Sequence, residues 1–456
     1  MENKAISENR SRFPDTFRAK QVILIAQWLA GGESGMIVGS SGAGKSNLVS
    51  FLMNRPDALA RYIARQPQRY CFLLLDVNAL PALTVPIFYR GLFQSLSDAA
   101  EQVDAELFHA VQALKTQPVN WDDSFAVLTL LQKAHQLFIR QAGKKIVWLL
   151  DRFDEACRYL DAQTLNSLRG LRDQFKEDLT YLLFTRQPLT RLRSLSEIDE
   201  FYEIVAANTC WLGPMSEADS RWMAQYMAAR RNLTFAEPIV TQLITLTGGL
   251  PAFLRGACLA LAQGELNPGQ SNQEWARQLL TRPEFQRNCQ EIWRDLTPEE
   301  QHALSALQTG GAISALDRNT VAYLENMGLI DKNKGLFSPI FAAYIAQQRG
   351  ETAGLLELHP KTRAVVRGGM ALNIELTPSE DRLLSFLLEH PGEICQKDTL
   401  IYAVWPNDYQ AAGISDERLA QLVKRLRDKI EPNPTDPLYI QTVRGRGYRL
   451  VQPGEA

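Results

Sequence analysis

Residues 39–46 read GSSGAGKS, which matches the pattern G-x-x-x-x-G-K-S/T of phosphate-binding loops. The apolar run before the loop, residues 36–38, predicts a buried strand, and residues 47–53 predict an amphipathic helix after it. Glycines let the backbone turn so that its amides point at a phosphate, and the start of the helix adds the positive end of its dipole. This context favours a strand, phosphate loop and helix over a flexible Gly/Ser loop.

The loop also predicts which side chains hold a nucleotide. The Lys45 ammonium is expected to neutralise the β- and γ-phosphates, and the Ser46 hydroxyl is expected to ligate Mg²⁺. The predicted cofactors are therefore ATP or ADP, together with Mg²⁺. The predicted nucleotide-binding residues of the loop are Gly39, Ser40, Ser41, Gly42, Ala43, Gly44, Lys45, Ser46 and Asn47.

The composition is that of an ordinary globular protein, and it argues against several classes. The 456 residues are 45% hydrophobic and carry a formal net charge of −2, so any contact with nucleic acid must be local. The six cysteines form no C-x-x-C pair and the five histidines are scattered, which argues against a His/Cys metal site. The start of the chain has no apolar signal-peptide core, and the run at 22–30 is too short to cross a bilayer. We expect a cytoplasmic protein of two to four domains that does not bind a membrane.

A second acidic position follows another predicted strand. Residues 146–151 read IVWLLD, and a strand of a parallel sheet delivers its last residue to the edge where ligands bind. Asp151 is therefore predicted to hold Mg²⁺ together with Ser46. Many ATPases of this type carry an acid at the next position to polarise the attacking water, but this chain has Arg152. Either Asp154 or Glu155 takes that catalytic role, or both cap a helix at 156–160 and hydrolysis is slow or absent.

A further strand is predicted at 180–185, and Arg186 follows it. At the tip of a strand beside the phosphate loop, Arg186 is a candidate catalytic sensor of the γ-phosphate; the alternative is a surface salt bridge. Strands are also expected at 71–77 and 209–213. The alternation of strands and helices predicts an α/β fold with a five-stranded parallel sheet, covered by helices on both faces.

The N-terminal half, residues 13–349, resembles the STAND class of P-loop ATPases, which is close to the AAA+ initiator ATPases. The resemblance rests on GSSGAGKS at 39–46, IVWLLD at 146–151, TR at 185–186 and GGLP at 248–251. It implies that the G-L-P turn opens a lid helix over the adenine, which adds Gly249 and Pro251 to the nucleotide site. Arg255, one turn later, lies where related ATPases place a second phosphate sensor. The implied domains are an ATPase core at 1–214, a helical lid at 215–289 and an inner winged-helix domain at 290–349.

The last hundred residues resemble the OmpR/PhoB-type winged helix, the output domain of many bacterial response regulators. The resemblance is carried by LTPSEDRLLSFLLEHPGE at 376–393, RLAQLVKRLRDKIE at 418–431 and YIQTVRGRGYRL at 439–450. It defines a domain at 362–456, which follows a predicted linker at 350–361. Small strands are expected at 363–367 and 372–376, helices at 377–389, 397–404 and 415–430, and a β-hairpin at 438–451.

The third of these helices has a basic face with long side chains, which fits the major groove of double-stranded DNA. The hairpin is a wing that can reach a minor groove or phosphates. The predicted DNA-binding residues are Gln421, Lys424, Arg425, Lys429, Arg444 and Arg446. Two features depart from the family: an ATPase replaces the usual receiver domain, and acids are about as numerous as bases, so non-specific affinity should be modest.

Three functions fit these signatures. In the first, the protein is an ATP-binding transcriptional regulator, whose nucleotide state controls DNA binding or homo-oligomer assembly in response to an inducer that the sequence does not identify. In the second, it is a DNA-remodelling or loader ATPase, which predicts vigorous DNA-stimulated hydrolysis. In the third, it is a nucleotide-dependent defence or stress sensor, although the repeat region typical of such sensors is not visible.

Overall fold

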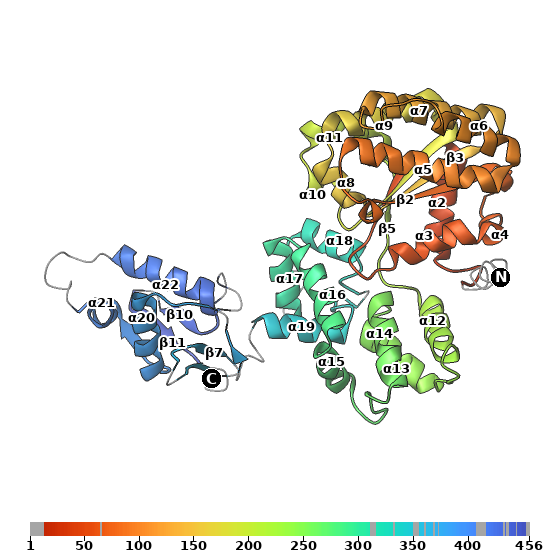
Figure 1. Cartoon of the computed structure of the whole chain (residues 1–456). Helices are drawn as coiled ribbons and strands as arrows, with labels where there is room; N and C mark the ends of the chain where they lie inside the picture. Colours follow the sequence, from red (N-terminus) through yellow and green to blue (C-terminus); the bar gives the residue numbers. More distant parts are fainter. Residues whose placement is uncertain are drawn as a thin grey trace. The chain divides into compact units, whose positions relative to one another are not determined.

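The computed structural model (Figure 1) describes residues 13–63, 66–310, 316–331, 333–349, 355–359, 362–367, 370–372, 374–406, 416–431, 434, 437–443 and 445–452. The chain forms two compact units, and we describe each by itself. The first comprises Met1–Gln301 and Ile313–Pro339, and the second comprises His302–Ala312 and Ile340–Ala456. Within the described residues, no helix is long and apolar enough to cross a membrane.

The first unit is built on a five-stranded parallel sheet, as the sequence predicts. Its strands are β1 Gly35–Val38, β2 Tyr70–Asp76, β3 Lys145–Asp151, β4 Leu179–Thr185 and β5 Thr209–Trp211. Their order across the sheet is β2-β3-β4-β1-β5, so β4 lies between the strand before the phosphate loop and the strand that ends in Asp151. Consecutive residues of β1, β3 and β4 are buried, which means that both faces of the sheet are covered.

The helices of this core pack on the sheet, with α5 on β2, α3 on β3, α8 and α9 on β4, α11 on β1, and α2 on β5. The core helices are α2 Ala19–Gly31, α3 Lys45–Asn54, α4 Pro56–Leu59, α5 Val85–Val103, α6 Ala105–Lys115, α7 Ser124–Gln136, α8 Phe153–Tyr159, α9 Ala162–Phe175, α10 Leu189–Leu192 and α11 Leu195–Ala206. Short 3-10 turns lie at η1 Pro67–Arg69, η2 Val77–Ala79 and η4 Lys176–Asp178, and the π-helical turn η3 Leu137–Gln141 follows α7.

A group of helices follows the sheet and forms the region predicted as a lid. These helices are α12 Glu217–Ala229, α13 Glu237–Thr247, α14 Pro251–Ala262, α15 Asn272–Leu280 and α16 Pro283–Arg294. Between α13 and α14 the chain turns at Gly248, whose φ is +59°. A Cβ atom there would lie 2.0 Å from the carbonyl oxygen of Phe337, so only glycine fits this turn. Helix α16 runs across the boundary predicted between residues 289 and 290.

The region predicted as an inner winged helix contains α17 Pro298–Gln308, α18 Arg318–Asn326 and α19 Pro339–Arg349. Before α19, an isolated β-bridge joins Ile330 to Leu336. The residues of α17 fall partly in the first unit and partly in the second. The start of α17 is fixed to the core, because the guanidinium of Arg191 binds both carboxylate oxygens of Glu300 and lies 3.5 Å from the centre of the Tyr323 ring.

In the C-terminal part of the second unit, the described residues form two small antiparallel sheets and three helices. Its elements are β6 Leu356–Leu358, β7 Val365–Arg367, β8 Met370–Ala371, α20 Pro378–Glu389, β9 Ile394–Gln396, α21 Lys397–Val404, α22 Asp416–Ile430, β10 Ile440–Val443 and β11 Gly447–Leu450. The sheets have the orders β6-β7-β8 and β10-β11-β9. The predicted helices and hairpin are therefore present, and their leucines form one core with Tyr439 and Leu450.

Two expectations about this part need correction. Strand β6 lies inside the range predicted as a linker, 350–361, where it pairs with β7, and Leu356 exchanges two backbone hydrogen bonds with the Gln452 side chain. The strand predicted at 372–376 is wrong, because the described residues of that range are not in a strand and the pairing ends at Ala371. Alternation of apolar residues over five positions is a weak signal for so short an edge strand.

Candidate functional site

The phosphate loop leaves the end of β1 and is covered by the first turn of α14. The Gly39 amide donates to Thr185 O at 3.1 Å, and Lys45 begins α3. Gly42 has a φ of +77°, and a Cβ atom on it would lie 2.7 Å from the Cβ of Ala252. The Ala252 amide donates to Gly42 O at 3.2 Å. The lid helix α14 therefore contacts the loop itself, at the position where a nucleotide's phosphates would be held.

The Lys45 side chain is partly buried, and its ammonium lies within this loop. It donates to the carbonyl oxygens of Gly39 at 2.6 Å and Ser40 at 3.2 Å. Burial lowers its pKa to about 8, although Asp154 and Asp151 act in the opposite direction. The hydroxyls of Ser40 and Thr185 are also buried, with no hydrogen-bond partner among the described residues. A partly buried cation beside two buried hydroxyls without partners fits an anionic ligand, so the loop suits the phosphates of a nucleotide.

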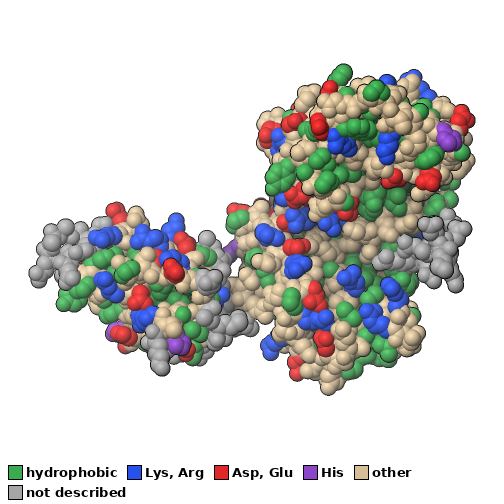
Figure 2. Space-filling view, viewed as in Figure 1, with side chains coloured by type: hydrophobic (Ala, Val, Ile, Leu, Met, Phe, Trp, Pro, Cys, Tyr) green, Lys and Arg blue, Asp and Glu red, His purple; other side chains and the backbone are tan. Residues whose placement is uncertain are grey.

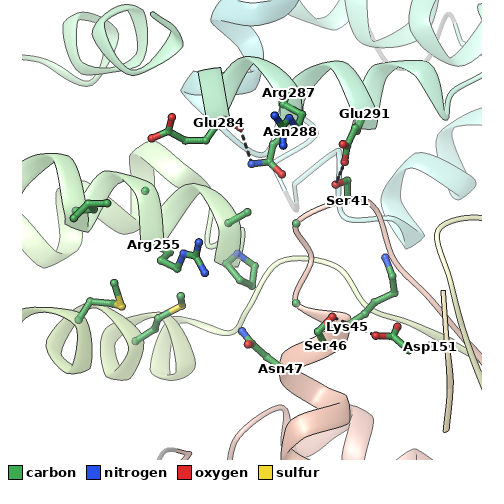
Figure 3. A pocket seen from close by; sticks show the side chains of 18 of the residues that line it. Ser41, Lys45, Ser46, Asn47, Asp151, Arg255, Glu284, Arg287, Asn288 and Glu291 are labelled. Atoms are coloured by element: carbon green, nitrogen blue, oxygen red, sulfur yellow. Dashed lines mark hydrogen bonds between the residues drawn. The ribbon is translucent and has the colours of Figure 1, made fainter. Parts of the chain in front are cut away.

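A pocket of about 1210 Å³ opens beside the loop. Among the predicted site residues, those that line it are Ser41, Gly42, Gly44, Lys45, Ser46, Asn47, Asp151, Asp154, Glu155, Arg186, Pro251 and Arg255. Figure 3 shows the labelled side chains from the loop, α14 and α16 around this space. The remaining four predicted residues support the loop instead. Gly39, Ser40 and Ala43 offer carbonyl oxygens to Lys45 or Arg18, and Gly249 O accepts from the Met215 amide.

One end of the pocket is aromatic. Phe17 and Trp222 lie with ring centres 5.9 Å apart, and Trp222 stacks on Tyr226 at 5.4 Å. Beside them, Arg18 is buried and binds Gly213 O, Pro214 O and Ala43 O, which ties the loop to the chain that enters the lid. Flat rings and methionines suit a nucleobase. Sequence reasoning missed Trp222 and Tyr226, since aromatic residues in an amphipathic helix look the same as core residues.

Oxygen atoms suited to Mg²⁺ lie at the loop's helix start. The Ser46 hydroxyl donates to Asp151 Oδ2 at 3.4 Å, and Asp151 lies opposite Asp76 in the neighbouring strand. Burial, and then the charge of Asp76, raise the pKa of Asp151. A divalent cation would relieve this pair of carboxylates. In the described part of the chain, no three His, Cys, Asp or Glu side chains could hold a metal by themselves, so Mg²⁺ would need phosphate and water ligands as well.

The residues after β3 and β4 meet at the phosphate end of the pocket. Asp154 is buried, and its Oδ1 accepts from the Arg186 amide at 2.8 Å. Helix α8 begins at Phe153, so Asp154 and Glu155 lie in its first turn and do not cap a helix at 156–160. The slow or absent hydrolysis of that alternative stays a prediction. Glu155 lines the pocket and lies 3.5 Å from Arg158. Whether either acid acts in catalysis stays a prediction.

Arg186 stands at the tip of the strand beside the loop, because β4 pairs with β1 and Thr185 lies opposite Val38. Its side chain is 28% exposed and lines the pocket, and its Nε lies 3.5 Å from Asp295 Oδ2. Arg186 therefore forms an ion pair, and its role as a sensor of the γ-phosphate stays a prediction. The pair joins the end of β4 to the end of α16.

Helix α16 gives the pocket a wall that sequence reasoning missed. Glu284, Arg287, Asn288 and Glu291 all line it, and Figure 3 shows these side chains on one side of the helix. Glu291 Oε2 accepts from the Ser41 hydroxyl at 2.5 Å. Their spacing of three or four residues is the available signal, because it places polar side chains on one face of a helix.

Helix α22 carries most of the predicted DNA-binding residues. Its leucines are buried in the domain core, while Gln421, Lys424 and Arg425 are exposed. Arg446 is exposed in the turn of the hairpin, and Arg444 lies outside the described residues. Figure 2 shows Lys and Arg side chains over the place of α22, with acidic side chains among them. An exposed basic helix of this kind fits a DNA groove.

Lys429 has a different place from the one predicted. Its ammonium donates to Glu380 Oε2 at 2.6 Å and to Glu375 O at 2.8 Å. Glu380 is 1% exposed and also closes the capping box of α20, where it accepts from the Thr377 amide. Lys429 therefore ties α22 to α20, and this inward contact argues against a role in reading DNA. Helical spacing alone could not show the contact, because Lys429 lies one helical turn after the exposed Arg425, on nearly the same face of α22.

Arg418 is exposed near the start of α22 and was missed. Its guanidinium lies 4.8 Å from the centre of the Trp405 ring, which follows α21. Such stacking fixes a cation without neutralising it. Arg418 therefore joins the basic side chains that α22 offers to solvent.

Comparison with known proteins identifies the C-terminal domain. Residues 371–450 match the family "Transcriptional regulatory protein, C terminal". The chain is 46% identical over 81 residues to the alkaline phosphatase synthesis transcriptional regulatory protein PhoP of Bacillus subtilis, covering 18% of this chain and 32% of the relative. It is 40% identical over 101 residues to the transcriptional regulatory protein AfsQ1 of Streptomyces coelicolor, covering 22% and 42%. The chain thus spans less than half the length of these relatives.

Solved structures match each part of the chain. The Walker-type ATPase PABY2304 of Pyrococcus abyssi matches 72% of this chain and 95% of its own, with 15% identity and a TM-score of 0.47. The ORC2 protein of Aeropyrum pernix matches 71% and 93%, with 13% identity and a TM-score of 0.39. The RstA DNA-binding domain of Klebsiella pneumoniae, in complex with the RstA box, matches 22% and 93%, with 30% identity and a TM-score of 0.19.

Because these TM-scores are below 0.5, the fold of the first unit rests on its own sheet order and phosphate loop. These features are those of a P-loop ATPase fold. The family match confirms the predicted OmpR/PhoB-type winged helix at the C-terminal end. Membership of the STAND class stays a prediction.

Proposed function

From a transcription regulator's winged-helix domain joined to a P-loop ATPase fold, we propose a nucleotide-controlled regulator of the STAND type. In this proposal the first unit binds ATP or ADP with Mg²⁺. The bound nucleotide then controls how the C-terminal winged helix binds double-stranded DNA or assembles with other copies of the chain.

One observation carries the nucleotide part of the proposal: the lid touches the phosphate loop from two helices. Ala252 of α14 donates to Gly42 O, and Glu291 of α16 accepts from Ser41. A ligand bound between the loop and these helices must change both contacts. Binding energy that differs between two lid positions is what a nucleotide-dependent equilibrium requires.

Within this proposal the roles of the residues follow from their places. Lys45 and the loop amides would hold the phosphates, and Ser46 with Asp151 would hold Mg²⁺, which would offset the negative charge of the phosphates. The aromatic end of the pocket, with Phe17, Trp222 and Tyr226, takes the base.

The proposed contacts to DNA come from the exposed side of α22 and from the hairpin. Gln421, Lys424 and Arg425 enter the major groove, and Arg446 contacts phosphates or the minor groove. Gln421 can read a base edge by hydrogen bonds, whereas the cations mainly supply affinity.

A loader or remodelling ATPase is the second candidate, and one contact favours a regulator over it. Arg152 occupies the position after Asp151, its backbone is left-handed with a φ of +56°, and its Nε lies 3.8 Å from Asp76. A cation at that position cannot accept a proton from an attacking water. Weak turnover suits a switch better than a motor.

Titration calorimetry on the full chain tests nucleotide binding. Mg·ATP and Mg·ADP should bind the native chain with one site each, and Lys45→Ala should reduce both affinities at least tenfold. Thermal unfolding of each chain without nucleotide shows whether the variant is folded. A folded native chain that takes up neither nucleotide would remove the proposal and leave only the DNA-binding domain.

A further inference from the structure

We infer that Glu291 and Asp295, at the end of α16, determine how strongly the site prefers a nucleoside triphosphate over a diphosphate. They do so by holding two groups, the Ser41 hydroxyl and the Arg186 guanidinium, at the phosphate end of the pocket. The inference rests on the proposed function and deepens it, since it concerns the same nucleotide site.

Helix α16 is fixed firmly enough to place these carboxylates. Phe285 is buried against Phe253, with ring centres 5.7 Å apart, and it fills the space that a Cβ atom on Gly256 would need. Cys289 and Ile292 are buried on the same helix. Glu291 and Asp295 are four residues apart, so both project toward the loop and the end of β4.

The first contact is with the phosphate loop. Glu291 accepts a hydrogen bond from the Ser41 hydroxyl, in the segment that would wrap around a phosphate. A carboxylate, like a phosphate, is negatively charged and accepts hydrogen bonds through its oxygen atoms. In the free protein Glu291 therefore accepts from the Ser41 hydroxyl, which could otherwise donate to a phosphate of the ligand. Its negative charge also opposes the approach of a polyphosphate.

The second contact is with the sensor position. Asp295 Oδ2 lies 3.5 Å from Arg186 Nε, and the backbone carbonyl of Asp295 accepts a hydrogen bond from the side-chain Nε2 of Gln187. The Asp295 side chain is only 14% exposed, and Oδ2 makes no hydrogen bond of good geometry to a described residue. Burial raises the pKa of this carboxyl, and Arg186 partly offsets that effect. Asp295 is thus a mostly buried carboxylate, and among the described residues one loose ion pair holds it.

These two contacts affect the two nucleotides differently. A γ-phosphate adds negative charge at the end of the chain of phosphates, where Arg186 would bind it and Asp295 would compete for the same guanidinium. A diphosphate lacks that group and leaves the Arg186–Asp295 pair intact. Neutral side chains at 291 and 295 should therefore favour ATP more than ADP, because they remove the competitor and the repulsion.

The test compares ATP and ADP dissociation constants, with Mg²⁺, for single variants of the full chain. Asp295→Asn and Glu291→Gln should each raise the ratio of ATP to ADP affinity about tenfold, which corresponds to about 1.4 kcal/mol. Glu284→Gln is the matched control, because Glu284 lines the pocket from the same helix but pairs with Arg282 and not with the loop. The ratio of ATP to ADP affinity in Glu284→Gln should stay within about twofold of the native value.

A second comparison isolates the sensor. In an Arg186→Gln background, Asp295→Asn should no longer change the ratio, because the guanidinium for which it competes is gone. The inference is overturned if Asp295→Asn and Glu291→Gln change both affinities by the same factor, or if Glu284→Gln changes the ratio equally. Either variant alone decides this if the other does not fold. Failure of the native chain to bind any nucleotide would instead overturn the proposed function.

Discussion

Replacing Gly42 by alanine should push the lid away from the phosphate loop and lower the free energy of unfolding by an amount that the structure predicts. Gly42 has a φ of +77°, a left-handed conformation that costs an L-residue about 1 to 2 kcal/mol. The new Cβ would lie 2.7 Å from the Cβ of Ala252, well inside the distance of about 3.5 to 4 Å at which carbon atoms attract. Overpacking of this kind costs about 1 to 3 kcal/mol. Gly42→Ala is therefore expected to lower the free energy of unfolding by about 2 to 5 kcal/mol in total.

A double-mutant cycle with Ala252→Gly separates the two contributions. Ala252→Gly alone should cost about 1 kcal/mol or less, since it places glycine in the first turn of α14. In that background the second Cβ is absent, so Gly42→Ala should cost only the backbone part, about 1 to 2 kcal/mol. Urea unfolding, followed by circular dichroism, measures the free energy of unfolding of the native chain, the two single variants and the double variant.

The cycle can refute the closed arrangement of the lid. If Gly42→Ala costs the same in both backgrounds, its methyl group does not meet α14 in solution. The lid would then stand away from the loop in the free protein, and the contacts that carry the proposed function would have no basis.

Two other predictions concern the winged helix and the sheet. Lys424→Ala should weaken DNA binding and reduce by about one the slope with which the logarithm of the DNA-binding constant falls against the logarithm of salt concentration. Lys429→Ala should leave this slope unchanged and lower the free energy of unfolding of the domain by about 2 to 3 kcal/mol, because Glu380 loses a charged partner. Equal slopes for the two variants would contradict the placement of Lys429. His135 is buried, its Nε2 accepts from the Trp148 indole at 2.9 Å, and burial lowers its pKa to about 4. The unfolded chain takes up this proton below about pH 6.5 and the folded chain does not, so stability should fall by about 2 kcal/mol from pH 7 to pH 5. Urea unfolding at pH 7 and pH 5 should show a smaller loss of unfolding free energy in His135→Gln than in the native chain. Equal losses in the two chains would show that His135 does not cause the pH dependence.

Local pattern was sufficient to predict the sheet, whereas the winged helix was predicted from a family resemblance. GSSGAGKS and the apolar runs around it predict β1, the loop and α3, because each local preference agrees with the fold. These are signals with periods of a few residues, and they do not depend on distant partners. The winged helix was predicted from its resemblance to the OmpR/PhoB-type family, which three strings of its sequence carry, and its helices and hairpin are present in the structure.

The features that the sequence could not supply depend on contacts between distant segments. Glu291 and Asp295 are about 250 and 110 residues from their partners Ser41 and Arg186, and no periodicity reports such a pairing. Lys429 was assigned to DNA for the same reason, since its bond to Glu380 joins two helices about 50 residues apart. Tertiary contact, rather than local propensity, decides what a charged side chain does.

The central claim is that nucleotide bound around Lys45 changes how the C-terminal winged helix binds DNA. Duplexes obtained by in-vitro selection with the native chain allow this to be measured by fluorescence anisotropy, without nucleotide, with Mg·ADP and with Mg·ATP. We predict that DNA affinity differs at least fivefold between the ADP and ATP states of the native chain, and that the difference disappears in Lys45→Ala. Equal affinity in all three states of a native chain shown to bind nucleotide would contradict the claim.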